Sequence, residues 1–93
     1  MNVEAGTKQI LEILLGDDKV LNRMGGELVR QFFRTLNVLL AAESIEDLVV
    51  FRSTGYKFYN GFHQVNVGGD YRLWFTLESN GTIILREFDQ GNH

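Results

Sequence analysis

The chain of 93 residues contains no cysteine and only two histidines, and these shortages exclude several kinds of site. Without thiols the protein forms no disulfide bond and no thiolate metal centre, so a reducing compartment is compatible with folding. Glycine-rich phosphate loops of the dinucleotide-binding or P-loop type are also absent. The composition therefore predicts a protein that uses neither a metal ion nor another cofactor.

Proline and long hydrophobic runs are missing as well. No proline-rich linker, repeat or low-complexity tract divides the chain, which predicts a single domain over residues 1–93. The longest apolar runs of the second half, residues 48–51 and 83–85, are far shorter than the roughly 20 residues that cross a bilayer. The first residues lack the basic and apolar segments of a signal peptide, so the expected location is the cytoplasm, without a membrane partner.

The chain also lacks an excess of positive charge. Its net charge is −3, which argues against binding nucleic acid by electrostatics alone, because phosphate contacts need clustered lysine and arginine. Residues 1–47 hold five basic and eight acidic side chains, whereas residues 48–93 hold four of each. An anion site is therefore expected in the second half.

The first half has helical periodicity. Apolar residues spaced four apart predict a short helix over residues 7–15, which Gly16 ends and after which Asp17 or Asp18 caps a second helical segment. Gly25 and Gly26 predict a break in that segment, followed by a longer helix over residues 26–42. Ser44 and Asp47 have the spacing of a helix-capping or turn signal.

In the second half the period approaches two, which is typical of strands. The predicted strands are residues 48–51, 56–59, 62–67, 70–78 and 82–89. Gly68-Gly69 and Asn80-Gly81 are predicted to be two-residue hairpin loops. The expected fold class is α+β, with two or three N-terminal helices on one face of a three- to four-stranded antiparallel sheet.

These two loops predict the strand register. The second loop pairs Arg72 with Asp89 and Trp74 with Glu87, and the first places His63 beside Trp74 and Val65 beside Arg72. The face predicted to pack on the helices carries Tyr71, Leu73, Phe75, Leu77, Ile84 and Phe88. The opposite face is predicted to present His63, Arg72, Trp74, Glu87 and Asp89.

Several segments of the second half resemble the RelE/ParE superfamily of bacterial toxins. The similar segments are Tyr56-Lys57, the strand Gly69-Asp70-Tyr71-Arg72-Leu73-Trp74-Phe75, the apolar Ile83-Ile84-Leu85 and the closing His93. The resemblance implies an α+β toxin of a toxin–antitoxin system, in many members an endoribonuclease that cuts messenger RNA on the ribosome and in others an inhibitor of DNA gyrase. It also implies an antitoxin protein as partner. Members usually open with a strand, for which residues 1–6 leave little room.

The resemblance also implies roles for individual residues. Arg72 would stabilise the phosphate, Lys57 would lie on the substrate face, and His93 would be the terminal histidine of ribonuclease members. Cleavage by a ribose 2′-hydroxyl further requires a base, and Glu87 or His63 has the chemistry for it. Trp74 would offer a stacking surface for a nucleobase.

Plainer interpretations stay open for the same residues. Arg72 and Asp89 would form an ordinary cross-strand ion pair, His63 would be a packed strand residue, and Lys57 and Glu87 would be solvated surface charges. The second functional hypothesis is a non-catalytic binding protein on the same scaffold. It would dock an antitoxin-like helix or a second copy of the chain on an apolar patch beside Trp74, formed by Val65, Ile83 and Leu85.

Overall fold

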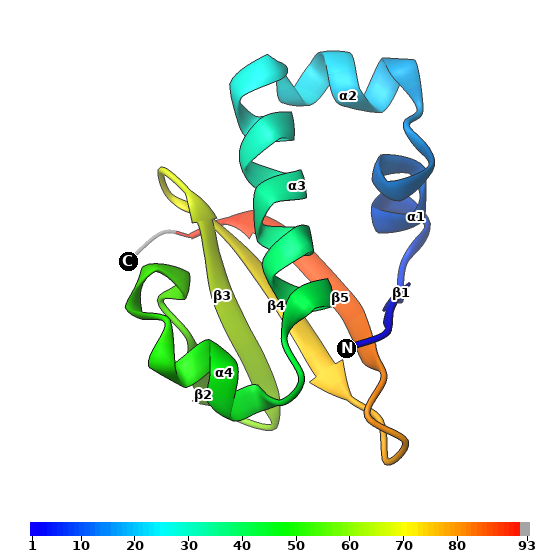
Figure 1. The fold of residues 1–93 in the computed structure, drawn as a ribbon. Helices are drawn as coiled ribbons and strands as arrows, with labels where there is room; N and C mark the ends of the chain where they lie inside the picture. The colour runs from blue at the N-terminus through cyan, green and yellow to red at the C-terminus, as the bar shows by residue number, and fades with distance from the viewer. Residues whose placement is uncertain (92–93) are drawn as a thin grey trace.

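Residues 1–91, the part of the chain that the computed structural model describes, form four α-helices and one five-stranded sheet (Figure 1). The elements in chain order are β1 (Val3–Ala5), α1 (Lys8–Leu15), α2 (Asp18–Met24), α3 (Gly26–Ala41), α4 (Ile45–Val50), a 3₁₀ turn (Arg52–Thr54), β2 (Lys57–Tyr59), β3 (Phe62–Gly68), β4 (Tyr71–Leu77) and β5 (Ile83–Gln90). The predicted α+β class is confirmed, with more helices and strands than expected.

The boundaries of the first helices follow local capping chemistry. The Thr7 side chain accepts a hydrogen bond from the Ile10 backbone N–H at 3.2 Å, and Gly16 ends α1 in the left-handed conformation. The Asp17 carboxylate caps α2 by accepting from two backbone N–H groups. The predicted break occurs at Gly25, where φ is +88° and α2 gives way to α3.

The segment 48–51, predicted as a strand, lies instead in α4 and at its end. Leu48 is fully buried, whereas the three apolar residues after it are exposed, a helical rather than an alternating pattern. The Asp47 carboxylate accepts from the Glu43 backbone N–H at 2.8 Å and stabilises the entry to the helix. The strand prediction was wrong because a short apolar run has no periodicity that separates the two structures.

The sheet is mixed, in the order β1-β5-β4-β3-β2, and not entirely antiparallel. β1 runs parallel to β5, with Val3 opposite Ile83, so the first residues do form an edge strand. The pairing continues at Gly6, whose N–H donates to the Leu85 carbonyl at 2.7 Å. A Cβ at Gly6 would lie 2.6 Å from that same oxygen, so this close approach requires glycine.

The β4–β5 register agrees with the prediction away from the turn and differs near it. Arg72 lies opposite Asp89 and Trp74 opposite Glu87, as predicted. The loop, however, has three residues: Glu78 donates to the Thr82 carbonyl at 2.8 Å, and Gly81 alone is left-handed. A bulge at Arg86 restores the outer register. Between loop and bulge, Ile83 and Leu85 face the helices and Ile84 faces away, which corrects the predicted position of Ile84 in the core.

The β3–β4 register is shifted by one residue from the prediction. The loop is Gly69-Asp70, Gly68 lies opposite Tyr71, and a bulge occurs between Asn66 and Gly68. The resulting pairs are His63 with Phe75, Gln64 with Trp74, Val65 with Leu73, and Asn66 with Arg72. Because a one-residue shift exchanges the two faces of a strand, His63 and Val65 point to the helices. The predicted placements of His63 beside Trp74 and of Val65 beside Arg72 were wrong.

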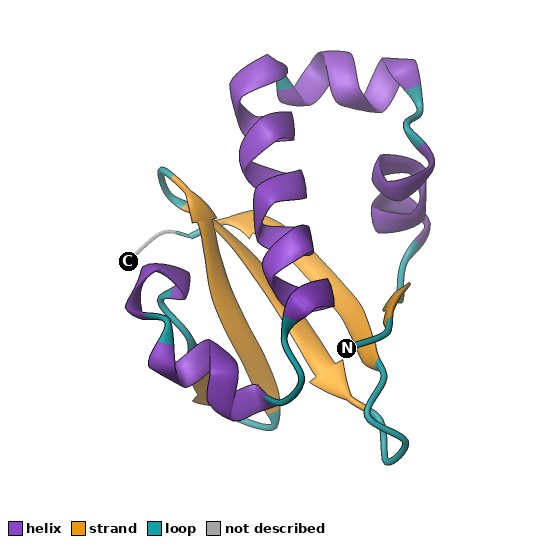
Figure 2. Ribbon diagram, in the orientation of Figure 1, coloured by secondary structure: helices purple, strands orange, loops and turns teal. Residues whose placement is uncertain are grey.

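The hydrophobic core lies between the helices and one face of the sheet (Figure 2). Its buried members include Ile10, Ile13, Phe32, Leu36, Leu39, Leu48, Val65, Leu73, Phe75, Ile83, Leu85 and Phe88. Val65 is 1% exposed, and Ile83 and Leu85 are 0% exposed. They therefore form no exposed docking patch, contrary to the prediction. None of the helices in residues 1–91 is long and apolar enough to cross a membrane.

Candidate functional site on the open sheet face

Four of the predicted site residues share the sheet face that points away from the helices, which we call the open face: Lys57, Arg72, Trp74 and Glu87. Lys57, Gln64, Trp74 and Glu87 lie directly opposite one another on β2, β3, β4 and β5 and form one continuous cross-strand row. Arg72 lies in the adjoining row, between Asn66 and Asp89. Neighbouring strands are about 4.8 Å apart, so side chains of these two rows can act on one ligand.

Arg72 is held by a buried amide. With the Gln64 oxygen turned towards the guanidinium, it accepts from Arg72 Nε at 3.1 Å and from Nη1 at 2.9 Å. Within residues 1–91 the structure has one ion pair, Arg30 with Glu27, so the expected Arg72–Asp89 ion pair is not formed there. The guanidinium leans along the sheet towards the row of Trp74, and the contact with Gln64 restricts its orientation.

The surroundings of Glu87 make its carboxylate a stronger base than that of an ordinary glutamate. Its side chain is exposed, yet partial loss of hydration raises the pKa of its carboxyl above the ordinary value of 4.5. Asp89, two residues along β5 on the same face, raises the pKa further through its negative charge and a side-chain hydrogen bond. A carboxylate with a raised pKa accepts a proton more readily near neutral pH than an ordinary glutamate.

Two hollows flank these side chains on the open face. One, of about 250 Å³, is lined by Tyr59, Asn60, Phe62, Trp74, Arg86 and Glu87. The other, of about 180 Å³, lies beside Arg72 and the β3–β4 loop and is lined by Asn66, Gly69, Asp70, Tyr71, Arg72 and Gly91. The sequence prediction omitted Gln64, Tyr59, Phe62 and Arg86. These residues were omitted because the predicted register of β3 was wrong by one residue and because the bulge at Arg86 was not predicted.

His63 does not belong to this site. Its Nδ1 lies 2.6 Å from the Tyr56 hydroxyl, and its ring stacks on Phe75 at a centroid distance of 5.0 Å on the helix side of the sheet. Burial raises the pKa of Tyr56, so its hydroxyl stays protonated beside the His63 ring. The prediction of a packed strand residue describes His63 better than that of a substrate contact. The other predicted histidine, His93, lies outside the described residues.

Protonation of His63 is expected to destabilise the fold. Burial lowers the pKa of His63 below its ordinary value of 6.5, so the unfolded chain binds this proton more readily than the folded one. The free energy of unfolding should therefore keep its full value above about pH 6.5 and fall as the pH decreases through the lower folded-state pKa. Urea midpoints between about pH 7.5 and 5.5 measure this effect. His63→Gln should flatten the profile, and an unchanged slope would contradict the assignment.

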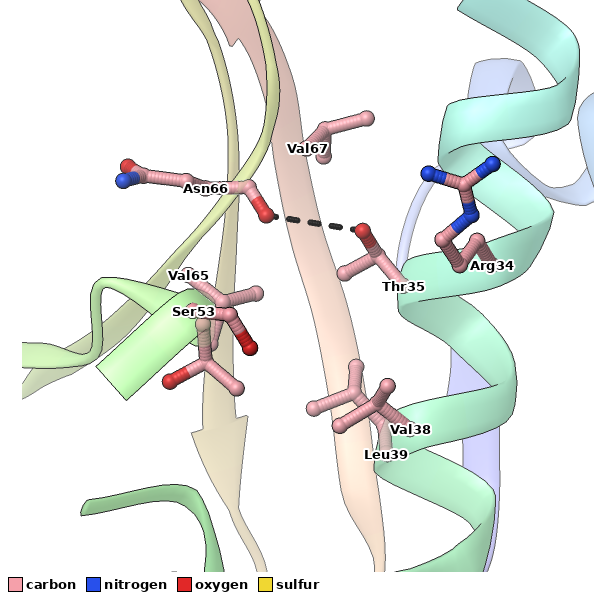
Figure 3. Close-up of a pocket in the computed structure, with 9 residues that line it drawn as sticks. Arg34, Thr35, Val38, Leu39, Ser53, Val65, Asn66 and Val67 are labelled. Carbon is pink, nitrogen blue, oxygen red and sulfur yellow. Dashed lines mark hydrogen bonds between the residues drawn. The ribbon is translucent and has the colours of Figure 1, made fainter. Parts of the chain in front are cut away.

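A further pocket, of about 200 Å³, lies on the helix side, between α3 and β3 (Figure 3). Arg34, Thr35 and Val38 line it from α3, and Val65, Asn66 and Val67 from β3. The Thr35 hydroxyl donates to the Asn66 carbonyl across it at 3.4 Å. None of the predicted site residues in the described part of the chain lines this pocket, although Asn66 lines both this pocket and the hollow beside Arg72.

Comparisons of the chain with protein-family models, with curated proteins and with solved structures gave no match. The relationship to RelE/ParE toxins rests on the segments that resemble them and stays a prediction. Among residues 1–91, no three histidine, aspartate or glutamate side chains gather where they could hold a metal ion.

Proposed function

We propose that this protein is a toxin-like endoribonuclease of a toxin–antitoxin system that cleaves messenger RNA in the cytoplasm. The observation that carries the proposal is the row Lys57, Gln64, Trp74 and Glu87, with Arg72 beside it. This arrangement combines a cation, an aromatic surface and a carboxylate on a face that no helix of the described chain covers. The resemblance of β4 to the toxin superfamily supports the same assignment.

The chemistry can be written with these groups. Glu87 removes the proton of a ribose 2′-hydroxyl, and the oxygen attacks the adjacent phosphorus. Arg72 stabilises the negative charge that develops on the phosphate oxygens, and Lys57 binds a neighbouring phosphate. The bond to the 5′-oxygen then breaks, and this oxygen takes a proton from an acid, a role for which the predicted terminal histidine, His93, has the chemistry. The products are a 2′,3′-cyclic phosphate and a free 5′-hydroxyl.

The charge of the open face is more favourable than that of the whole chain. The chain carries −3. Over β2–β5, this face has three basic side chains, Lys57, Arg72 and Arg86, and two acidic ones, Glu87 and Asp89. An RNA phosphate is therefore repelled less here than the net charge suggests.

The second candidate is a non-catalytic binding protein. Because the predicted patch of Val65, Ile83 and Leu85 is buried, the support for this candidate comes from another part of the surface. A mainly apolar pocket of about 500 Å³ lies between the end of α3 and the α4 segment, lined by Val38, Ala41, Ala42, Asp47, Phe51, Ser53 and Thr54. Phe51 and Val50 are largely exposed beside it. An antitoxin-like partner would bury this apolar surface.

The direct test incubates the purified protein with messenger RNA and ribosomes and maps the new 5′ ends. Glu87→Gln is expected to slow cleavage about a hundred-fold, near the lower end for a general base, because Glu87 is exposed. The wild-type rate should fall with decreasing pH at a higher pH than for an ordinary glutamate, since the base must be deprotonated. The variant should lose this limb of the profile.

Glu78→Gln is the matched control, because Glu78 is an exposed carboxylate just beyond β4. It should leave both rate and pH profile unchanged. Equal profiles for wild type and Glu87→Gln would remove Glu87 as the base. A wild-type protein that cuts no RNA but captures a partner on the α3–α4 pocket would establish the second candidate instead.

A further inference from the structure

We propose that the hollow lined by Tyr59, Phe62 and Trp74 binds one unpaired nucleobase of a single-stranded RNA while Arg72 binds an adjacent phosphate. The choice of RNA as the ligand rests on the proposed function. The base subsite itself stands on the geometry of three strands and on the chemistry of the side chains around the hollow.

The aromatic walls are held by a tight hairpin. Asn60 and Gly61 have φ values of +52° and +82°, the two positive angles that a type I′ turn requires. This turn fixes Tyr59 directly opposite Phe62, and both point to the open face. Tyr59 is 65% exposed and Phe62 is 41% exposed. Two large aromatic side chains held in water on a rigid turn are well suited to stacking on a flat ligand.

The third wall has a polar group that lacks a partner. Trp74 Nε1 is buried and has no hydrogen-bond partner among the described residues. An unsatisfied buried N–H is costly, but this one is shielded from solvent, so a ligand acceptor would reach it only after the side chains around it shift. Nucleobases present a flat aromatic surface, which matches the aromatic lining of this hollow by Tyr59, Phe62 and Trp74.

Charged side chains at the rim favour a nucleotide over an apolar ligand. Arg86 lines the hollow from the β5 bulge, and its Nε donates to the Thr76 hydroxyl at 2.9 Å, which positions the guanidinium on the open face. Glu87 lines the same hollow and adds an acceptor. A donor and an acceptor side by side can read the edge of a base, as such pairs do in single-stranded RNA recognition.

The spacing along β4 supports binding of base and phosphate together. Arg72 and Trp74 are two residues apart on one face, which corresponds to about 6.6 Å along a strand. The second hollow lies beside Arg72 and the β3–β4 loop and is lined by different residues from the aromatic one. A base inside the aromatic hollow must leave its stack, so a single strand should bind and a duplex should not.

Trp74 is the only tryptophan of the chain, so its fluorescence reports on the hollow directly. The experiment titrates the protein with a single-stranded 2′-O-methyl RNA heptamer, which cannot be cleaved because its 2′-oxygens are blocked. We expect saturable quenching, with binding at least ten-fold weaker for the same sequence as a duplex. Tyr59→Ala and Tyr59→Leu should each weaken binding about ten-fold, within the range for loss of one stacked base.

Phe58→Ala is the matched control. Phe58 is the neighbour of Tyr59 on β2, is 60% exposed, and points to the other face of the sheet, where it contacts His63. It should change affinity less than two-fold. Equal affinities for wild type and both Tyr59 variants, or a tryptophan signal that does not respond to RNA, would overturn the base subsite.

The binding and cleavage experiments can fail separately. Quenching that depends on Tyr59, without cleavage of unmodified RNA, would support the subsite and reject the nuclease. Cleavage that Tyr59→Ala leaves unchanged, without quenching by the blocked RNA, would support the nuclease and reject the subsite. Circular dichroism of the Tyr59 variants should match the wild type, because Tyr59 lies exposed at the sheet edge.

Discussion

Replacing Arg72 with alanine is expected to lower the rate of RNA cleavage about a thousand-fold, because loss of one preorganised donor to a developing anion typically costs about 10² to 10³ in rate. Arg72 meets the condition of preorganisation when the Gln64 oxygen is turned towards the guanidinium, since it then accepts from both Nε and Nη1. Arg72→Lys should recover only part of the rate, because an ammonium group keeps the charge but cannot reproduce the planar contact. The measurement is the rate of messenger RNA cleavage in the presence of ribosomes, for wild type, Arg72→Ala and Arg72→Lys.

Arg34→Ala is the matched control for this experiment. Arg34 is an exposed arginine on α3, on the helix side of the sheet, so its removal changes the net charge equally without touching the open face. It should leave cleavage within about two-fold of wild type. If Arg34→Ala and Arg72→Ala slow cleavage equally, the effect is one of overall charge, and the specific role of Arg72 is rejected. In cells, induced Arg72→Ala should not arrest growth.

The predicted pairing of Arg72 with Asp89 is correct even though the turn next to it was predicted wrongly. The three-residue loop at Ser79-Asn80-Gly81 moves the register by one residue, and the bulge at Arg86 moves it back. The two departures cancel for the outer half of the hairpin. In the residues between the loop and the bulge the register stays shifted by one residue, which is why Ile84 was assigned to the wrong face. A bulge depends on packing against other elements, so a two-strand argument from sequence does not find it.

The register of β3 could have been predicted from the turn that precedes the strand instead of the turn that follows it. Asn60-Gly61 is the pair that forms the type I′ turn, and it fixes β3 against β2. The prediction relied on Gly68-Gly69 instead, where a bulge moves the loop by one residue. Packing from α3 constrains this point, because a Cβ at Gly68 would lie 2.4 Å from the Gln31 side chain. The tertiary contact that shapes the bulge has no local sequence signal.

Helix caps and glycine breaks, by contrast, are local, and they were predictable. Thr7, Gly16, Asp17 and Gly25 each act through their own backbone or a hydrogen bond within the next turn. The edge strand β1 was not predictable, because Val3–Ala5 is too short for an alternating pattern and pairs with residues some 80 positions away along the chain. The candidate site depends on long-range register, so the register argument grouped only its β4 and β5 members correctly, and Lys57 of β2 was placed on the same face by the resemblance alone.

Replacing Phe75 with alanine is expected to lower the free energy of unfolding by about 3–5 kcal/mol, the usual cost of deleting a fully buried phenylalanine. Phe75 is 0% exposed and lies on β4 directly after Trp74, on the opposite face. Domains of this size are stable by about 5–15 kcal/mol, so the variant should be partly unfolded in water or unfold at much lower urea. Trp74 fluorescence during urea denaturation measures the midpoint in both proteins.

Phe58→Ala is the control that separates core packing from loss of an aromatic ring as such. Phe58 and Phe75 flank the same His63 ring, with centroid distances of 4.8 Å and 5.0 Å, but Phe58 is 60% exposed. Its removal should cost less than about 1 kcal/mol, because little buried area is lost. Equal losses in the two variants would mean that β4 does not turn Phe75 into the core. Because successive strand residues point to opposite faces, Trp74 and Arg72 would then both face the helices. The candidate site on the open face would be rejected.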